Sequence, residues 1–349
     1  MAIVVHDRHL NEYEDSARNP VKLPTNASGV LKSVLSISEE DVDRTLTFQK
    51  SIQLARRAYA LRAKKKVLEP LRTWFTVRGG ASFYFMPAHV SGLDTVSVKV
   101  VSVNPRNRNG SLPSTSATIY VFDSKTGSEL ARVAGDNLTA IRTAASSALA
   151  TELLALRETD SLGIIGTGKQ AHAHLLAMLQ ARNISQVLVY SPSKAHRQRF
   201  VRKASQISPV PVYAERSAEE VARRSHLLVL ATSSRVPLLR GSAVRLGTHV
   251  NAIGAALPSS REMDTVLVKR SILVVDSLEQ AVATYGDIMI PLKEGAITKS
   301  HIKAELGELL LDPSIIERGR NNITVFKAGG LGVLDAVFAD YVVSQFWRS

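Results

Sequence analysis

The feature that most constrains this chain is a glycine turn in mid-sequence, Gly163-Ile164-Ile165-Gly166-Thr167-Gly168-Lys169-Gln170-Ala171. A buried strand is expected before it (161–166), a helix after it (170–181) and a second strand at 186–190. Glycines at this spacing permit a tight turn and let a ligand approach the backbone, while the first N–H groups of the helix face phosphate. We therefore predict a dinucleotide-binding βαβ unit whose cofactor contacts are Gly166, Thr167, Gly168, Lys169 and Gln170.

Short apolar segments continue to alternate with helical patterns after this unit, at 211–213, 226–231, 249–253 and 272–275. Such segments are typical of a parallel sheet that is buried on both faces, with ligand at the carboxyl ends of its strands. Upstream, a helical pattern covers 35–66 with Ser38 as its cap, and strands are expected at 72–77, 81–86, 95–103 and 117–122. Helices are expected at 140–156 and 333–346.

The predicted fold class is therefore α/β, with a Rossmann-type doubly wound parallel sheet domain and a second α+β domain. Residues 140–324 form the first of these and residues 35–139 plus 325–349 the second. Residues 1–34 are polar and irregular and are expected to form an N-terminal extension.

Composition excludes several classes of protein. With no cysteine, the chain has no disulfide, thiolate nucleophile or zinc-thiolate site. No stretch approaches the about 20 apolar residues that a membrane span needs, and the N-terminus lacks the pattern of a signal peptide. We expect a cytoplasmic protein without a membrane partner. His172 and His174 do not share a helix face, so no metal site is predicted.

The net charge of +13 comes from 44 basic and 31 acidic residues, with basic clusters at 56–66 and 194–203. The first cluster is typical of a solvated helix end, where cations complement the helix dipole. Aromatic content is only 5%, and no nucleic-acid-binding module is recognisable, so no nucleic-acid partner is expected. A positive field would also attract anionic substrates and a phosphorylated cofactor.

The end of the second strand of the βαβ unit indicates which nicotinamide cofactor is preferred. An NAD-binding domain usually places Asp or Glu there to hold the ribose hydroxyls. This chain has no acid from 187 to 203 and instead offers Ser191, Ser193 and Lys194. Because hydroxyls and cations suit a 2′-phosphate, we predict NADP(H) in preference to NAD(H).

Several segments occur in the order found in one family: Met86-Pro87-Ala88, Val98-Lys99-Val100-Val101, Leu138-Thr139-Ala140-Ile141-Arg142-Thr143-Ala144-Ala145, the glycine turn, Asn251-Ala252-Ile253-Gly254-Ala255 and Ala304-Glu305-Leu306-Gly307-Glu308. Together they resemble the ornithine cyclodeaminase/mu-crystallin family over about residues 35–345. The resemblance implies a nicotinamide-dependent enzyme acting on small amino or imino acids, and a homodimer formed through the first domain's sheet.

By the same resemblance, Arg72 and Arg142 match the family's substrate-carboxylate arginines, and Lys99 matches its active-site lysine. Arginine suits a carboxylate because its planar guanidinium donates two parallel hydrogen bonds. Lys99 lies among valines, which suits a group that transfers protons, although a strand lysine often only faces water. The match also places Ser114, Thr115 and Thr232 near the cofactor. The segment Phe326-Lys327-Ala328-Gly329-Gly330 departs from the family, which more often has a serine followed by an apolar residue.

A second departure affects the expected reaction. Ala256 stands where cyclodeaminases carry a catalytic aspartate, and alanine can neither bind an ammonium group nor move a proton. Glu262 and Asp264 follow, but both are expected to be acids of a helix's first turn. We therefore predict an oxidoreductase acting on C–N bonds, which reduces an α-imino acid (ketimine) or oxidises the amino acid. The alternatives are an ornithine cyclodeaminase, or a non-catalytic protein that binds NADPH and a small ligand.

Overall fold

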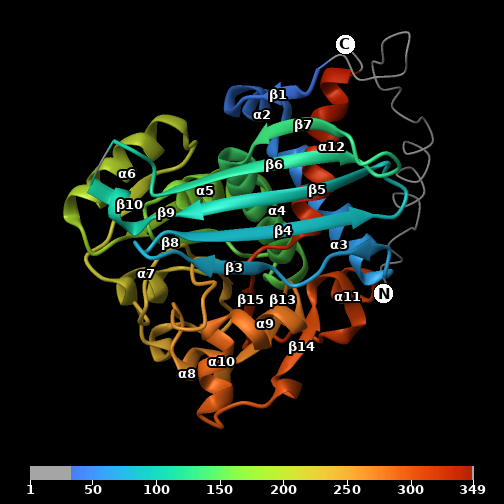
Figure 1. Ribbon diagram of the computed structural model, residues 1–349. Coiled ribbons are helices and arrows are strands. Elements are labelled where there is room, and N and C mark those ends of the chain that lie inside the picture. Colours follow the sequence, from blue (N-terminus) through green and yellow to red (C-terminus); the bar gives the residue numbers. More distant parts are fainter. Residues whose placement is uncertain (1–32, 110, 348–349) are drawn as a thin grey trace. The chain divides into compact units, whose positions relative to one another are not determined.

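The computed structural model describes residues 33–109 and 111–347 (Figure 1). The chain divides into two compact units. Unit 1 takes in the described residues of 1–47, 64–139 and 332–349, and unit 2 takes in 48–63 and 140–331. Nearly all of the predicted N-terminal extension, 1–34, lies outside the described residues.

Unit 1 contains a mixed seven-stranded sheet in the order β1-β7-β6-β5-β4-β2, with β3 also paired to β4. All neighbouring pairs are antiparallel except β1 with β7. The strands are β1 (Leu35–Ile37), β2 (Val67–Leu68), β3 (Thr73–Thr76), β4 (Ser82–Val90), β5 (Thr95–Val103), β6 (Thr115–Asp123) and β7 (Glu129–Ala134). The four strands expected here are confirmed, while β1, β2 and β7 were not anticipated.

One face of this sheet is covered by helix α12 (Gly332–Trp347), which packs on β4 and β5. Side chains alternate across the sheet, so β5 buries Thr95, Ser97 and Lys99 on the α12 side. The prediction that the C-terminal helix packs on the first domain is confirmed. On the opposite face, side chains such as Phe83, Phe85, Val98 and Val100 are only partly buried.

The helical pattern expected over 35–66 forms three elements rather than one: β1, α2 (Glu39–Thr45) and α3 (Phe48–Ala63). Ser38 caps α2 as predicted, and its hydroxyl accepts a hydrogen bond from Asp41 N–H in a capping box. The residues before Ser38 pair with β7 instead of continuing the helix, because an N-cap has extended backbone and begins the helix.

Unit 2 is built on a sheet of eight strands in the order β10-β9-β8-β11-β12-β15-β13-β14, and every neighbouring pair is parallel. The strands are β8 (Ser161–Ile165), β9 (Gln186–Tyr190), β10 (Val212–Ala214), β11 (Leu227–Leu230), β12 (His249–Ala252), β13 (Ser271–Val275), β14 (Ile302–Glu305) and β15 (Ile323–Lys327). This confirms the predicted doubly wound sheet. The strand order reverses between β8 and β11, which is the topological switch point where such sheets bind ligands.

Helices cover both faces of this sheet. Ala218, Leu267, Ala281 and Ile288, from four different helices, share one apolar core with inward-facing residues of the strands. On the other face, α4 meets β12 through a hydrogen bond from Asn251 Nδ2 to Thr151 Oγ1 (2.9 Å). The helices are α4 (Gly135–Leu154), α5 (Lys169–Ala181), α6 (Lys194–Ile207), α7 (Ala218–Arg224), α8 (Thr265–Arg270), α9 (Leu278–Thr284), α10 (Gly286–Lys293) and α11 (Leu306–Leu311).

Within the described ranges, none of the helices is both long enough and apolar enough to cross a membrane.

Candidate active site

The glycine turn joins β8 to α5 at the switch point, and its geometry explains why position 166 is glycine and leaves open space at Gly168. Gly166 has φ +123°, and a Cβ there would lie 2.3 Å from the carbonyl oxygen of Ala231, so only glycine fits. Gly168 is the N-cap of α5, and a Cβ there would meet nothing within 4 Å. Thr167, Lys169 and Gln170 complete the turn and are exposed or half-buried. A free helix N-terminus beside an uncrowded glycine fits the diphosphate of a dinucleotide.

The residues that follow β9 are polar and basic, as the sequence predicted. Ser191 is buried, and its carbonyl accepts a hydrogen bond from Arg197, whose guanidinium lies 5.4 Å from the centre of the Tyr190 ring. Ser193 caps α6 by accepting a hydrogen bond from His196 N–H (3.3 Å), and Lys194 is exposed at the first position of that helix. Hydroxyl and cationic groups therefore gather at the end of β9.

An acid does lie beside β9, but it comes from the next strand. Glu215 N–H donates to Val189 O (2.8 Å), and the Glu215 carboxylate pairs with Arg224 at 2.5 Å. The pairing neutralises a carboxylate that would otherwise repel a phosphate at this edge.

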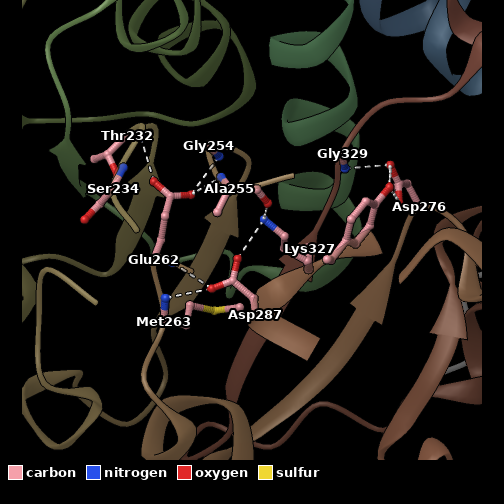
Figure 2. Close-up of polar contacts among 11 residues, drawn as sticks. Thr232, Ser234, Gly254, Ala255, Glu262, Met263, Asp276, Asp287, Lys327 and Gly329 are labelled. Atoms are coloured by element: carbon pink, nitrogen blue, oxygen red, sulfur yellow. Dashed lines mark hydrogen bonds and ion pairs between the residues drawn. The ribbon is translucent and has the colours of Figure 1, made fainter. Parts of the chain in front are cut away.

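At the carboxyl ends of β11 and β12, Thr232 and Gly254 are tied together by Glu262 (Figure 2). The prediction that Glu262 and Asp264 are acids of a helix's first turn is wrong: α8 begins at Thr265 with Asp264 as its cap, and Glu262 precedes the helix and is 2% exposed. Burial raises the pKa of Glu262, and Asp287 raises it further, while Lys327 and the Thr232 N–H lower it. Ala256 lies half-buried just beyond, where the family's cyclodeaminases have an aspartate.

Arg142 lies two turns into α4 and is 4% exposed. Gly330 packs against its guanidinium: a Cβ at Gly330, which has φ +88°, would lie 2.4 Å from Nη1 of Arg142. Asp276 holds this segment, because its Oδ2 accepts hydrogen bonds from the N–H groups of Gly329 and Gly330 (2.9 Å each). Tyr285 also donates to Asp276 (2.9 Å), so the turn against Arg142 is held rigidly.

Lys99 lies at the centre of unit 1's sheet and does not face water. Its ammonium forms an ion pair with Asp335 of α12 at 2.7 Å, and both side chains are 1% exposed. Lysine and aspartate side chains are almost never fully buried unless they are paired with an opposite charge. Here β5 and α12 pack against each other and hold the two side chains together. Asp335 was not anticipated, although an acid within the apolar run of residues 332–343 was a signal.

The remaining predicted residues of unit 1 lie on the same sheet. Arg72 directly precedes β3 and is half-buried. The next residue, Thr73, is opposite Phe85 of β4, and Phe85 is opposite Val100 of β5, so Arg72 lies near the sheet position of Lys99, two strands away. Ser114 and Thr115 lie at the start of β6, two strands from β3's partner β4, and Ser114 O accepts from Asn104 N–H (2.8 Å). Unit 1 thus carries Arg72, Lys99, Ser114 and Thr115, while every other predicted site residue belongs to unit 2.

Two further residues were missed by the sequence reasoning. Asp287 and Lys327 are fully buried and form an ion pair at 2.9 Å, next to Glu262 (Figure 2). Among the described residues, no group of three or more His, Cys, Asp or Glu side chains is arranged to hold a metal ion.

Comparison with known proteins establishes the class to which this fold and these residues belong. Residues 32–348 match the model of the ornithine cyclodeaminase/mu-crystallin family. The chain belongs to this family, and the resemblance inferred from its motifs is confirmed.

Three relatives show what kinds of enzyme it is similar to. It is 33% identical to the ketimine reductase mu-crystallin of Rattus norvegicus over 286 residues, 81% of this chain and 86% of that protein. Its fold is similar to that of Thermococcus litoralis Δ1-pyrroline-2-carboxylate reductase in complex with NADH and L-proline, with a TM-score of 0.88, 35% identity, and coverage of 90% of this chain and 98% of that one. It is also similar to an archaeal alanine dehydrogenase dimer with bound NAD, with a TM-score of 0.84, 28% identity, and coverage of 90% and 97%.

Proposed function

We infer that this protein is a nicotinamide-dependent oxidoreductase that reduces the C=N bond of a small α-imino acid. The inference rests on the combination of the glycine turn at the switch point, a buried lysine–aspartate pair and buried Arg142 in a member of the ornithine cyclodeaminase/mu-crystallin family, and the relatives of this chain include a ketimine reductase. The similar T. litoralis enzyme binds NADH with L-proline, the product of reducing a cyclic imino acid. A cyclic ketimine carboxylate is accordingly the substrate class that we propose.

The reaction needs a hydride, a proton and an anchor for the substrate carboxylate. A nicotinamide cofactor, held at the glycine turn of Gly166 and Gly168, would supply the hydride when bound. Arg142 and Arg72 hold the carboxylate by paired charge-assisted hydrogen bonds, and the Lys99 ammonium, kept in place by Asp335, supplies the proton that the imine nitrogen gains. The reverse sequence would oxidise the amino acid to the imine.

Cyclodeamination of ornithine is disfavoured by the contacts around Ala256. That reaction requires an acid to handle the second amine of ornithine. Glu262 is the nearest acid in the sequence, but both of its oxygens already accept backbone N–H groups, and Asp287 is paired with Lys327. With neither carboxylate free, the site suits reduction of an existing imine.

We propose a preference for NADP(H) over NAD(H). The proposal rests on the polar and basic end of β9, Ser191, Ser193 and Lys194, and on the pairing of Glu215 with Arg224. Two similar structures hold NADH or NAD. The proposed preference is therefore argued from the residues of this chain and not from those relatives.

We also propose that the protein is a homodimer joined through the face of unit 1's sheet that α12 leaves uncovered. Phe75 on this face is 50% exposed and stacks on Phe83 and Phe85 (ring centres 5.8 Å apart in each case). A contiguous apolar sheet face is typical of an association surface, and the similar alanine dehydrogenase is a dimer. The cytoplasmic location stays a prediction from the sequence.

The test is the rate at which NADPH or NADH absorbance falls when purified protein is mixed with Δ1-pyrroline-2-carboxylate or Δ1-piperideine-2-carboxylate. We expect consumption of cofactor, faster with NADPH, and formation of the corresponding cyclic amino acid. Conversion of ornithine to proline and ammonia would instead show a cyclodeaminase with a rearranged site. Tight NADPH binding without turnover of any imino or amino acid would favour the non-catalytic protein.

A further inference from the structure

The carboxylate of Glu262 connects two neighbouring loops of unit 2 (Figure 2). Its Oε1 accepts a hydrogen bond from Thr232 N–H (2.6 Å), which follows β11. Its Oε2 accepts from Gly254 N–H (2.7 Å) and Ala255 N–H (3.2 Å), which follow β12. One side chain therefore fixes three backbone groups at the carboxyl ends of adjacent strands.

These loops are part of the crevice in which a doubly wound sheet binds its ligand. β11 lies between β8, which ends in the glycine turn, and β12. The packing is close: a Cβ on Gly166 would lie 2.3 Å from Ala231 O, and a Cβ on Gly254 would lie 2.1 Å from Thr232 O. A small shift of the loop after β11 would therefore move both of its neighbours.

Glu262 is itself held by a buried ion pair. Asp287 Oδ1 accepts from the N–H groups of Glu262 and Met263 (2.8 Å each), and Asp287 Oδ2 pairs with Lys327. Lys327 also donates from Nζ to Ala255 O (2.5 Å). Ala255 is thus held on its N–H side by Glu262 and on its C=O side by Lys327, so the two networks act on one peptide segment.

The charge of Glu262 matters because all three of its loop partners are N–H donors. Both oxygens of an ionised carboxylate can accept, whereas a protonated acid or an amide turns a donor toward one of the loops. Hydrogen bonds that involve a charged group are stronger than those between neutral groups. The charged groups that face Glu262 are Asp287 and Lys327.

We propose that Glu262 is a positioning residue for the nicotinamide cofactor: it fixes the ends of β11 and β12 in the arrangement that the cofactor binds. This proposal depends on the part of the proposed function that concerns cofactor binding. It does not depend on which substrate is reduced. Glu262 acts through the backbone of Thr232, Gly254 and Ala255 and takes no direct part in proton transfer.

The test compares Glu262→Gln with Asp264→Asn in the full chain. Asp264 is a matched control because its carboxylate also accepts two backbone N–H groups of unit 2, those of Gly241 (2.9 Å) and Leu267 (2.8 Å), but none at the ends of β11 or β12. Hydrogen exchange at the amides of Thr232, Gly254 and Ala255 is measured without cofactor, and NADPH dissociation constants are measured by fluorescence over a range of pH.

We expect Glu262→Gln to speed exchange at the three amides and to weaken NADPH binding by about 10-fold or more, while Asp264→Asn changes the dissociation constant less than twofold. In acid, NADPH affinity should fall more steeply in the wild type, where Glu262 becomes protonated, than in Glu262→Gln, where only the other titrating groups remain.

Equal weakening by both variants in proportion to lost Tm, or an unchanged dissociation constant in a folded Glu262→Gln, would overturn the proposal. If Glu262→Gln does not fold, wild-type exchange decides: the three amides must be protected as strongly as the core strands and lose that protection in acid. A wild type that binds NADPH but reduces no imino acid would refute the proposed function alone. Binding of neither cofactor would refute both.

Discussion

Gly330 provides the sharpest test of the role proposed for Arg142. A Cβ at Gly330 would lie 2.4, 2.7 and 2.9 Å from Nη1, Nη2 and Cζ of Arg142. Gly330→Ala therefore has to displace the guanidinium by about 1 Å to restore ordinary contact distances near 3.4 Å. It must also hold a non-glycine residue at φ +88°, which costs about 1–2 kcal/mol.

Gly295→Ala separates these two effects. Gly295 also has positive φ (+66°), but a Cβ there meets nothing within 4 Å, so this variant carries the backbone strain without touching Arg142. Gly295→Ala should lose about 1–2 kcal/mol of unfolding free energy in urea titrations, and Gly330→Ala should lose more, because it also displaces a buried guanidinium. Only Gly330→Ala should disturb substrate binding.

The assay is steady-state reduction of Δ1-pyrroline-2-carboxylate with NADPH. Misplacing a substrate-positioning group by about 1 Å can cost about 100-fold in rate. We expect kcat/KM to fall by about that factor in Gly330→Ala, mainly through KM, with NADPH affinity unchanged. If Gly330→Ala and Gly295→Ala have the same kcat/KM, Arg142 does not anchor the substrate.

Four further predictions follow from the described contacts. Lys99→Met should lose about 3–5 kcal/mol of unfolding free energy in urea, because it removes the ammonium that forms an ion pair with the buried Asp335 carboxylate, and Lys99→Met with Asp335→Leu should regain most of it. Burial lowers the pKa of His174 to about 4, whereas in the unfolded chain it is about 6.5. Below pH 6.5 the unfolded state therefore binds more protons than the folded state, and the free energy of unfolding decreases as the pH is lowered. Urea titrations at pH 6.5 and 5 should show a loss of unfolding free energy that is about 1.5 kcal/mol smaller in His174→Gln than in the wild type, the remainder coming from groups such as buried His249. Lys194→Ala should raise the KM for NADPH about tenfold and leave that for NADH unchanged; equal changes would contradict the 2′-phosphate contact. Phe75→Glu should shift the sedimentation coefficient from dimer toward monomer, and an unchanged value would exclude this face as the interface.

The fold was predictable wherever local chemistry decides it. The turn between β8 and α5 was predicted correctly because the backbone conformation at Gly166 excludes other residues, and β9 and β5 were located with their observed bounds because each is an apolar run between turns. The break between α2 and α3 was not predictable, since Leu46-Thr47 carries neither glycine nor proline.

The sequence indicated single candidate residues such as Lys99, but not the partners that these residues have in the fold. Lys99 and Asp335 are 236 residues apart in the chain, and no local pattern links β5 to the last helix. Glu262 and Asp264 read alike in sequence, because either could begin a helix. The difference arises from the ends of β11 and β12, whose N–H groups face one acid and not the other.

The most direct test of the central claim, proton transfer by Lys99 to an imino acid, is the single-turnover rate of imine reduction by cofactor-loaded wild type and Lys99→Met/Asp335→Leu. The double variant keeps the layer between β5 and α12 apolar and free of an unpaired charge. We predict that it binds NADPH as tightly as the wild type and reduces Δ1-pyrroline-2-carboxylate about 10²–10⁴-fold more slowly. Reduction at the wild-type rate by a folded, NADPH-bound double variant would contradict the account.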